Sequence, residues 1–110
     1  MTVKDLIESG MFELINEGDE PEREISKLFC CDMLSIAMSK ASAGCAWVTV
    51  MGNINTLAVA SLSDAACVIL AEGVRLDEPA SAKAKMQGIT VLRTEQPIFE
   101  AALAVHAKLS

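Results

Sequence analysis

Short apolar runs alternate along this chain with longer segments in which apolar residues recur with helical periodicity. This alternation is typical of βα units built on a largely parallel sheet. We therefore predict one α/β domain over residues 1–110, with a mainly parallel central sheet of about five strands flanked by helices. The expected strands cover residues 11–16, 25–31, 45–51, 65–71 and 89–93. The expected helices cover residues 3–9, 33–41, 54–63, 77–87 and a C-terminal segment that begins after residue 94.

Several residues at the predicted boundaries have the chemistry that helix ends require. Thr2, Asp32 and Thr94 precede helices as N-cap residues, and Gly88 stands where a helix commonly ends. Residues 17–24 combine turn-forming residues with a concentration of carboxylates that a core does not accept. We expect this segment to be a solvated loop.

Two predicted elements are apolar on more than one side. The strand 65–71 is the most apolar, so we expect it at the centre of the sheet. The helix 54–63 lacks a broad polar face, so the sheet should cover one side and another element or a second subunit the other. Because apolar residues make up 52% of the chain, we also expect self-association as a homodimer. The candidate interface residues are Leu57, Val59, Ala60 and Leu62.

Charge and composition exclude several classes of partner. The chain has nine Lys and Arg against fifteen Asp and Glu, with a formal net charge of -6. Nucleic-acid binding needs a basic patch that this sequence does not supply. No apolar stretch approaches the roughly 20 residues of a membrane span, and no secretion signal opens the chain. We therefore expect a cytoplasmic protein that binds neither nucleic acid nor membrane.

The four cysteines favour packing over chemistry. Cys45 and Cys67 fall in apolar strands, where a thiol behaves as a small hydrophobic group. Cys30 and Cys31 are adjacent on a strand and point to opposite faces, so one thiol can be exposed and redox-sensitive. The spacing of the cysteines does not fit a zinc site, and we predict neither a metal nor a cofactor.

The sequence contains no recognisable catalytic motif. Phosphate-loop, dinucleotide-binding, His-x-x-x-His and Gly-x-Ser-x-Gly patterns are all missing. The single histidine, His106, has no nucleophile or acid beside it in the local pattern, which favours a structural or surface role. An enzyme would require Asp32, Glu72 or His106 to meet in space. We predict a protein without catalytic residues.

A candidate binding site follows from the predicted topology. In an open α/β sheet, ligands bind outside the carboxyl ends of the strands, against helix N-termini whose free N–H groups suit anions. Polar, turn-forming residues follow four of the predicted strands, although each also has an ordinary capping explanation. The candidate ligand-binding residues are Asp32, Asn53, Asn55, Thr56, Glu72, Gly73, Thr94 and Gln96.

The ordered set of motifs resembles the DRTGG domain family over nearly the whole chain. The matching segments are Val-Lys-Asp-Leu at 3–6, Asp-Met-Leu-Ser at 32–35, Trp-Val-Thr-Val at 47–50, Ala-Val-Ala-Ser-Leu at 58–62, Val-Ile-Leu-Ala-Glu-Gly at 68–73 and Gly-Ile-Thr-Val-Leu at 88–92. The sequence looks most like short stand-alone members from anaerobic bacteria, some encoded beside iron hydrogenase and sensor kinase genes. The resemblance implies a homodimeric α/β regulatory unit, similar in fold to the N-terminal domain of HPr kinase/phosphorylase but without the kinase's phosphate loop.

The residues that give the DRTGG family its name are only partly present in this chain. This chain has Gly52-Asn53-Ile54 where the family has Gly-Asp-Arg, and Glu72-Gly73-Val74 where the family has Thr-Gly-Gly. Of the positions that correspond to these family residues, we carry over Asn53 and Gly73 as candidate site residues. Our first hypothesis is a homodimeric regulatory module that senses a small anionic metabolite or nucleotide. The alternative is an interaction or scaffold subunit of an anaerobic redox system, with an iron hydrogenase or sensor kinase as partner.

Overall fold

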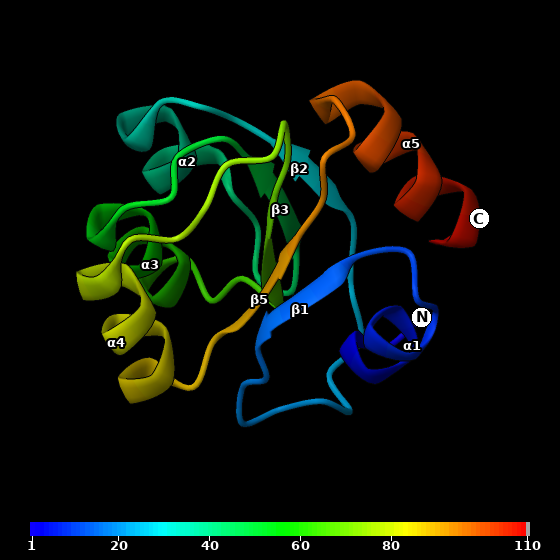
Figure 1. The fold of residues 1–110 in the computed structure, drawn as a ribbon, viewed down its shortest axis with the longest axis horizontal. Helices are drawn as coiled ribbons and strands as arrows, with labels where there is room; N and C mark the ends of the chain where they lie inside the picture. Colours follow the sequence, from blue (N-terminus) through cyan, green and yellow to red (C-terminus); the bar gives the residue numbers. More distant parts are fainter. Residues whose placement is uncertain (110) are drawn as a thin grey trace.

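A computed structural model describes residues 1–109, which contain five strands and five helices (Figure 1). Their order along the chain is α1-β1-β2-α2-β3-α3-β4-α4-β5-α5. The helices are α1 (Val3–Glu8), α2 (Leu34–Lys40), α3 (Ile54–Leu62), α4 (Glu78–Gln87) and α5 (Ile98–Leu109). The strands are β1 (Glu13–Asn16), β2 (Leu28–Cys30), β3 (Ala46–Thr49), β4 (Cys67–Leu70) and β5 (Thr90–Arg93). All the predicted elements are present.

The strands form one five-stranded sheet in the order β1-β5-β4-β3-β2. Strands β2 to β5 run parallel to one another, and β1 is antiparallel to β5. The predicted mainly parallel α/β sheet is therefore confirmed, with one antiparallel edge strand. The most apolar strand, β4, lies in the middle of the sheet, as predicted, and all four of its residues are buried.

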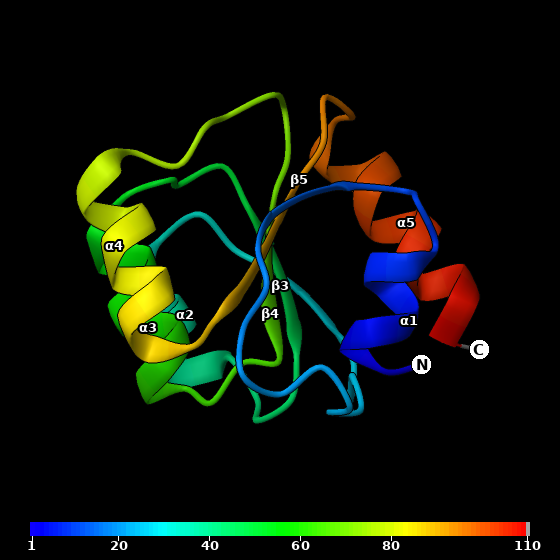
Figure 2. The ribbon, with the colours of Figure 1, turned by 60° about the horizontal axis from the view of Figure 1, so that its bottom comes forward.

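Helices cover both faces of the sheet, which gives the domain three layers (Figure 2). Successive strand residues point to opposite faces, so the central strands β3, β4 and β5 each supply two cores. On the side of α1 and α5, Ile69 and Leu92 pack with Leu6 and Val105. On the side of α2, α3 and α4, the second core contains Trp47, Val68, Leu70, Val91 and Leu57.

The N-terminal segment folds back onto the loop that precedes β2. Thr2 caps α1 in a reciprocal capping box with Asp5, as the sequence predicts. Thr2 also forms an isolated antiparallel bridge with Glu24. The predicted strand 25–31 is shorter than expected, because only Leu28–Cys30 pairs with β3. The acidic segment 17–24 contains neither helix nor strand apart from that bridge, in agreement with the predicted loop.

Helix α3 lies between α2 and α4 (Figure 1), so two neighbouring helices and the sheet cover it. The expectation of a helix covered on two sides is confirmed, and the cover comes from the same chain. Leu57, Val59 and Ala60 are buried in the monomer. Of the four candidate interface residues, Leu62 alone is exposed, at 73%. The apolar character of the other three is explained by intrachain packing.

No helix within residues 1–109 has the length and apolar content that crossing a membrane requires.

Candidate functional site

The parallel arrangement of β2 to β5 brings the predicted site residues to one edge of the sheet. The chain leaves these strands at Cys30, Thr49, Leu70 and Arg93, and the loops after β4 and β5 lie together at the top of Figure 2. We call this side of the sheet the carboxyl edge. The chain reversals that follow these four strands, which we call the four reversals, therefore lie at one edge of the sheet, as predicted.

Backbone hydrogen bonds join three of these reversals to one another. The amides of Glu72 and Gly73 donate to the carbonyls of Gln96 and Thr94 at 2.8 and 2.9 Å, which links the loops after β4 and β5. The amide of Asp77 donates to the carbonyl of Gly52 at 3.0 Å and links the loop after β3 to the start of α4. The loops therefore form one connected surface.

Asp32 does not cap α2, and this prediction is wrong. The N-cap of α2 is Met33, for which the described chain supplies no side-chain cap. The Asp32 carboxylate instead accepts hydrogen bonds from the Thr49 hydroxyl at 2.7 Å and the Val50 amide at 2.9 Å. A carboxylate accepts both bonds strongly, and Thr49 is fully buried, so this contact holds the end of β3 beside the end of β2.

The N-terminus of α3 is occupied by its own cap. The Asn53 side-chain oxygen accepts hydrogen bonds from the amides of Asn55 and Thr56 at 3.0 and 3.2 Å. The Asn55 side chain is exposed to solvent. The Thr56 hydroxyl is buried and has no hydrogen-bond partner among residues 1–109.

The reversal after β4 has an unusual backbone. Glu72 and Gly73 both have left-handed conformations, with φ of 59° and 74°, which is costly for a residue with a side chain. The Glu72 carboxylate accepts a hydrogen bond from the Ile98 amide at 3.1 Å and so caps α5. Thr94 is not that cap, contrary to the sequence prediction, since its hydroxyl oxygen accepts a bond from the Gln96 amide within the same turn.

Arg93 is a site residue that the sequence reasoning missed. It is the last residue of β5, and only 8% of its surface is exposed. Its guanidinium donates to Glu13 at 3.0 Å, to the Gly73 carbonyl at 2.9 Å and to Glu95 at 2.7 Å. The sequence feature that could have pointed to this residue is a single arginine at the end of a largely apolar strand. Its partner Glu13 lies 80 residues earlier in the chain, which no local pattern reveals.

The electropositive groups of the carboxyl edge already hold oxygen atoms of this chain. The N-termini of α3, α4 and α5 carry partial positive charge, and Asn53, Asp77 and Glu72 cap them in that order. The Arg93 guanidinium holds two carboxylates. A ligand that binds these groups must replace an internal acceptor.

A polar cavity of about 190 Å³ opens at the opposite, amino-terminal edge of the sheet, and no sequence pattern predicted it. It lies between the ends of α3 and α4 and the loop at 19–23. Arg23 forms a bidentate ion pair with Asp64 at 2.7 and 2.8 Å, and this contact lowers the pKa of the Asp64 carboxyl below its ordinary value. The cavity exists because the acidic loop folds against two helices that follow it in sequence.

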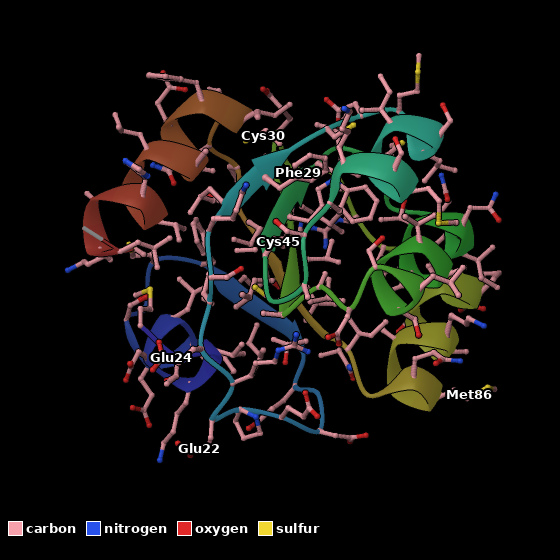
Figure 3. The ribbon with its side chains drawn as sticks, turned by 180° about the vertical axis from the view of Figure 1, so that it is seen from behind. Glu22, Glu24, Phe29, Cys30, Cys45 and Met86 are labelled. Atoms are coloured by element: carbon pink, nitrogen blue, oxygen red, sulfur yellow. The ribbon has the colours of Figure 1, made fainter. Side chains whose placement is uncertain are left out.

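The cysteines are free thiols in very different environments. Cys45 and Cys67 are buried, as predicted, and burial raises the pKa of Cys67 to about 12. Figure 3 shows Cys30 on the edge strand β2 and Cys45 in the interior. Cys30 is exposed, but partial burial and the charge of Asp32 raise its pKa. A thiol with a raised pKa is a poor nucleophile at neutral pH, so this environment does not activate Cys30.

The three residues that an enzyme would require come from two parts of the fold. Asp32 and Glu72 lie at the carboxyl edge and accept structural hydrogen bonds. His106 lies eight residues after the start of α5, a rise of about 12 Å along the helix axis. Within residues 1–109, no three His, Cys, Asp or Glu side chains are placed to hold a metal ion.

The comparisons with known proteins support the fold. No protein-family model matches the chain, and no curated protein matches it in sequence. Among solved structures, it is similar to the CBS and DRTGG domains of the regulatory region of Clostridium perfringens pyrophosphatase, which were crystallised with the activator diadenosine tetraphosphate. The match has a TM-score of 0.75 and 17% identity, and it covers 93% of this chain and 44% of that one. At this identity the likeness supports a fold of that kind, in line with the DRTGG resemblance of the sequence.

Proposed function

We propose that the chain is a non-catalytic regulatory module that binds a nucleotide or phosphorylated metabolite at the carboxyl edge of its sheet. The observation that carries the proposal is the gathering of three helix N-termini and a buried guanidinium on one connected set of loops. Helix N-termini and arginine are the groups that proteins use for phosphate. The similar pyrophosphatase region, which was solved with a nucleotide activator, is consistent with this class of ligand.

A thermal-melt screen against nucleotides, diadenosine tetraphosphate and phosphorylated metabolites tests the proposal. A ligand at a hundred times its dissociation constant adds about 2.7 kcal/mol to stability, which raises the Tm by roughly 10 °C. An unchanged Tm with every compound would refute ligand sensing.

Two alanine variants then locate the ligand. Asn55 is exposed at the carboxyl edge, whereas Gln87 lines the cavity at the opposite edge. We expect Asn55→Ala to reduce the ligand-induced rise in Tm and Gln87→Ala to leave it unchanged. The reverse result would move the site to the amino-terminal edge.

A homodimer and a cytoplasmic location are part of the same proposal. Because most of the candidate residues on α3 are buried in the monomer, Ile54 at its start and Leu62 at its end are the large apolar side chains of that helix that remain exposed for a partner. Light scattering on the purified chain over a range of concentrations measures the oligomeric state. A monomer at every concentration would contradict the dimer.

The second candidate function is a protein-interaction or scaffold subunit, with a redox enzyme or a sensor kinase as the proposed partner. It is favoured by an apolar groove beside the edge strand β2, lined by Leu28, Phe99, Ala102, Leu103 and His106. Phe99 and Leu103 are 69% and 52% exposed, which is unusual for side chains of this size. Loss of partner capture from the native cell by a Phe99→Ser variant, together with a negative ligand screen, would favour this function.

A further inference from the structure

Arg93 is a buried cation whose hydrogen-bonding capacity is incompletely used. Its side chain is 9% exposed, and its Nε atom is buried with no hydrogen-bond partner among residues 1–109. A guanidinium has five N–H donors, and a buried donor without an acceptor carries an energetic cost. The Arg93 guanidinium can therefore form a further hydrogen bond through its Nε–H if an additional acceptor binds beside it.

Its two carboxylate partners are both on the protein surface. Glu13 faces Arg93 in the neighbouring strand β1 and is held there by the sheet register. Glu95 lies in the loop after β5, and its side chain is 74% exposed. An exposed carboxylate on a flexible side chain contributes little to stability and is easily exchanged with water. Glu95 is thus the removable partner.

The backbone at Gly73 makes room for Glu95. A Cβ atom at this position would lie 2.8 and 2.9 Å from the two oxygens of the Glu95 carboxylate. The absence of a side chain on Gly73 therefore leaves space beside the guanidinium for one carboxylate group. The same space fits the oxygens of an incoming anion.

We propose that Arg93 is the anion receptor of the carboxyl edge and that Glu95 is an internal competitor, which an oxyanion ligand displaces. This inference rests on the proposed ligand-binding function and names its central residue. The ligand group is a phosphate or a carboxylate, because both present two oxygens to the fork of a guanidinium. On displacement, Glu95 turns into solvent while the contacts of Arg93 with Glu13 and Gly73 remain.

Glu95→Gln tests the competitor, and Glu100→Gln is its matched control. Both substitutions remove one negative charge from an exposed residue near the start of α5, but only Glu95 contacts Arg93. The sequence has three arginines, Arg23, Arg75 and Arg93, so their Nε–H signals are readily assigned by NMR in a ¹⁵N-labelled sample. Inorganic phosphate and sodium acetate serve as probes, titrated at constant ionic strength.

We expect Glu95→Gln to bind the probe on the order of tenfold more tightly than the wild type, because one charge-assisted bond no longer competes. The Arg93 Nε–H signal should move and saturate in the titration, while Glu100→Gln behaves as the wild type. A response to phosphate identifies a phosphoryl ligand, and a response to acetate alone identifies a carboxylate ligand. Equal binding by both variants, or an Arg93 signal that neither probe moves, overturns the inference.

The outcomes separate this inference from the function on which it rests. A ligand that stabilises the wild type and both variants equally would refute Glu95 as the competitor and leave ligand sensing intact. A negative melt screen combined with phosphate binding that depends on Glu95→Gln would refute nucleotide sensing and leave the Arg93 receptor intact.

Discussion

Leu57 and Leu62 lie on the same helix and provide a direct test of what covers α3. Leu57 is fully buried between the helices and the sheet, whereas Leu62 is 73% exposed. Leu57→Ala removes three buried carbon atoms, worth about 2.4 kcal/mol in transfer free energy alone. The remaining cavity brings the expected loss of stability to about 3 kcal/mol. Leu62→Ala should change the free energy of unfolding by less than about 0.5 kcal/mol in a monomer.

Circular-dichroism melts at two protein concentrations measure both effects. We expect the Tm of Leu57→Ala to fall by roughly 12–15 °C at either concentration. The Tm of Leu62→Ala should stay near that of the wild type. If Leu62→Ala destabilises the protein as strongly as Leu57→Ala, and more so at high concentration, then a second copy covers this helix and the reasoning from monomer burial is wrong.

Three further predictions concern buried polar contacts and thiols. Asp32→Ala leaves the buried Thr49 hydroxyl without its acceptor, whereas the exposed Val50 amide can bond to water instead, so we expect a cost of about 1–3 kcal/mol in a urea titration. Thr49→Val combined with it should cost less than the sum of the single effects, and additive losses would contradict the contact. Iodoacetamide at pH 8 should label Cys30 in the native protein and spare Cys67 until unfolding, so comparable labelling of both by mass spectrometry would contradict the burial. The pKa of Cys67 is about 12 when folded and about 8.5 when unfolded, so the unfolded chain loses its proton first and stability should fall as pH rises between these values. A Cys67→Ala variant should show a weaker dependence, because the raised pKa values of Cys30 and Cys45 act in the same direction and remain.

The sequence predicted the elements and their layers well because periodicity is a local property. Runs such as 67–70 are apolar on both faces, which identifies a central parallel strand without any knowledge of its neighbours. The topology rule for parallel strands then placed the reversals on one edge, and the structure agrees.

The roles of individual polar residues were less accessible because they depend on contacts across the sheet. Asp32 has the chemistry of a helix cap, but its strongest donor, Thr49, comes from the adjacent strand. Glu72 caps a helix that starts 26 residues later, a distance at which no capping rule operates. Arg93 was overlooked because its carboxylate partner in β1 is set by antiparallel register, which the sequence pattern does not encode.

The pairing of β1 with β5 affects how the chain folds during translation. The strand Glu13–Asn16 leaves the ribosome well before its sheet partner Thr90–Arg93 is made. The nascent chain therefore carries an unpaired strand while residues 17–89 are made, and the sheet is complete only when β5 enters between β1 and β4. Pairings so distant in sequence slow folding and leave the incomplete chain open to association with other unfolded chains.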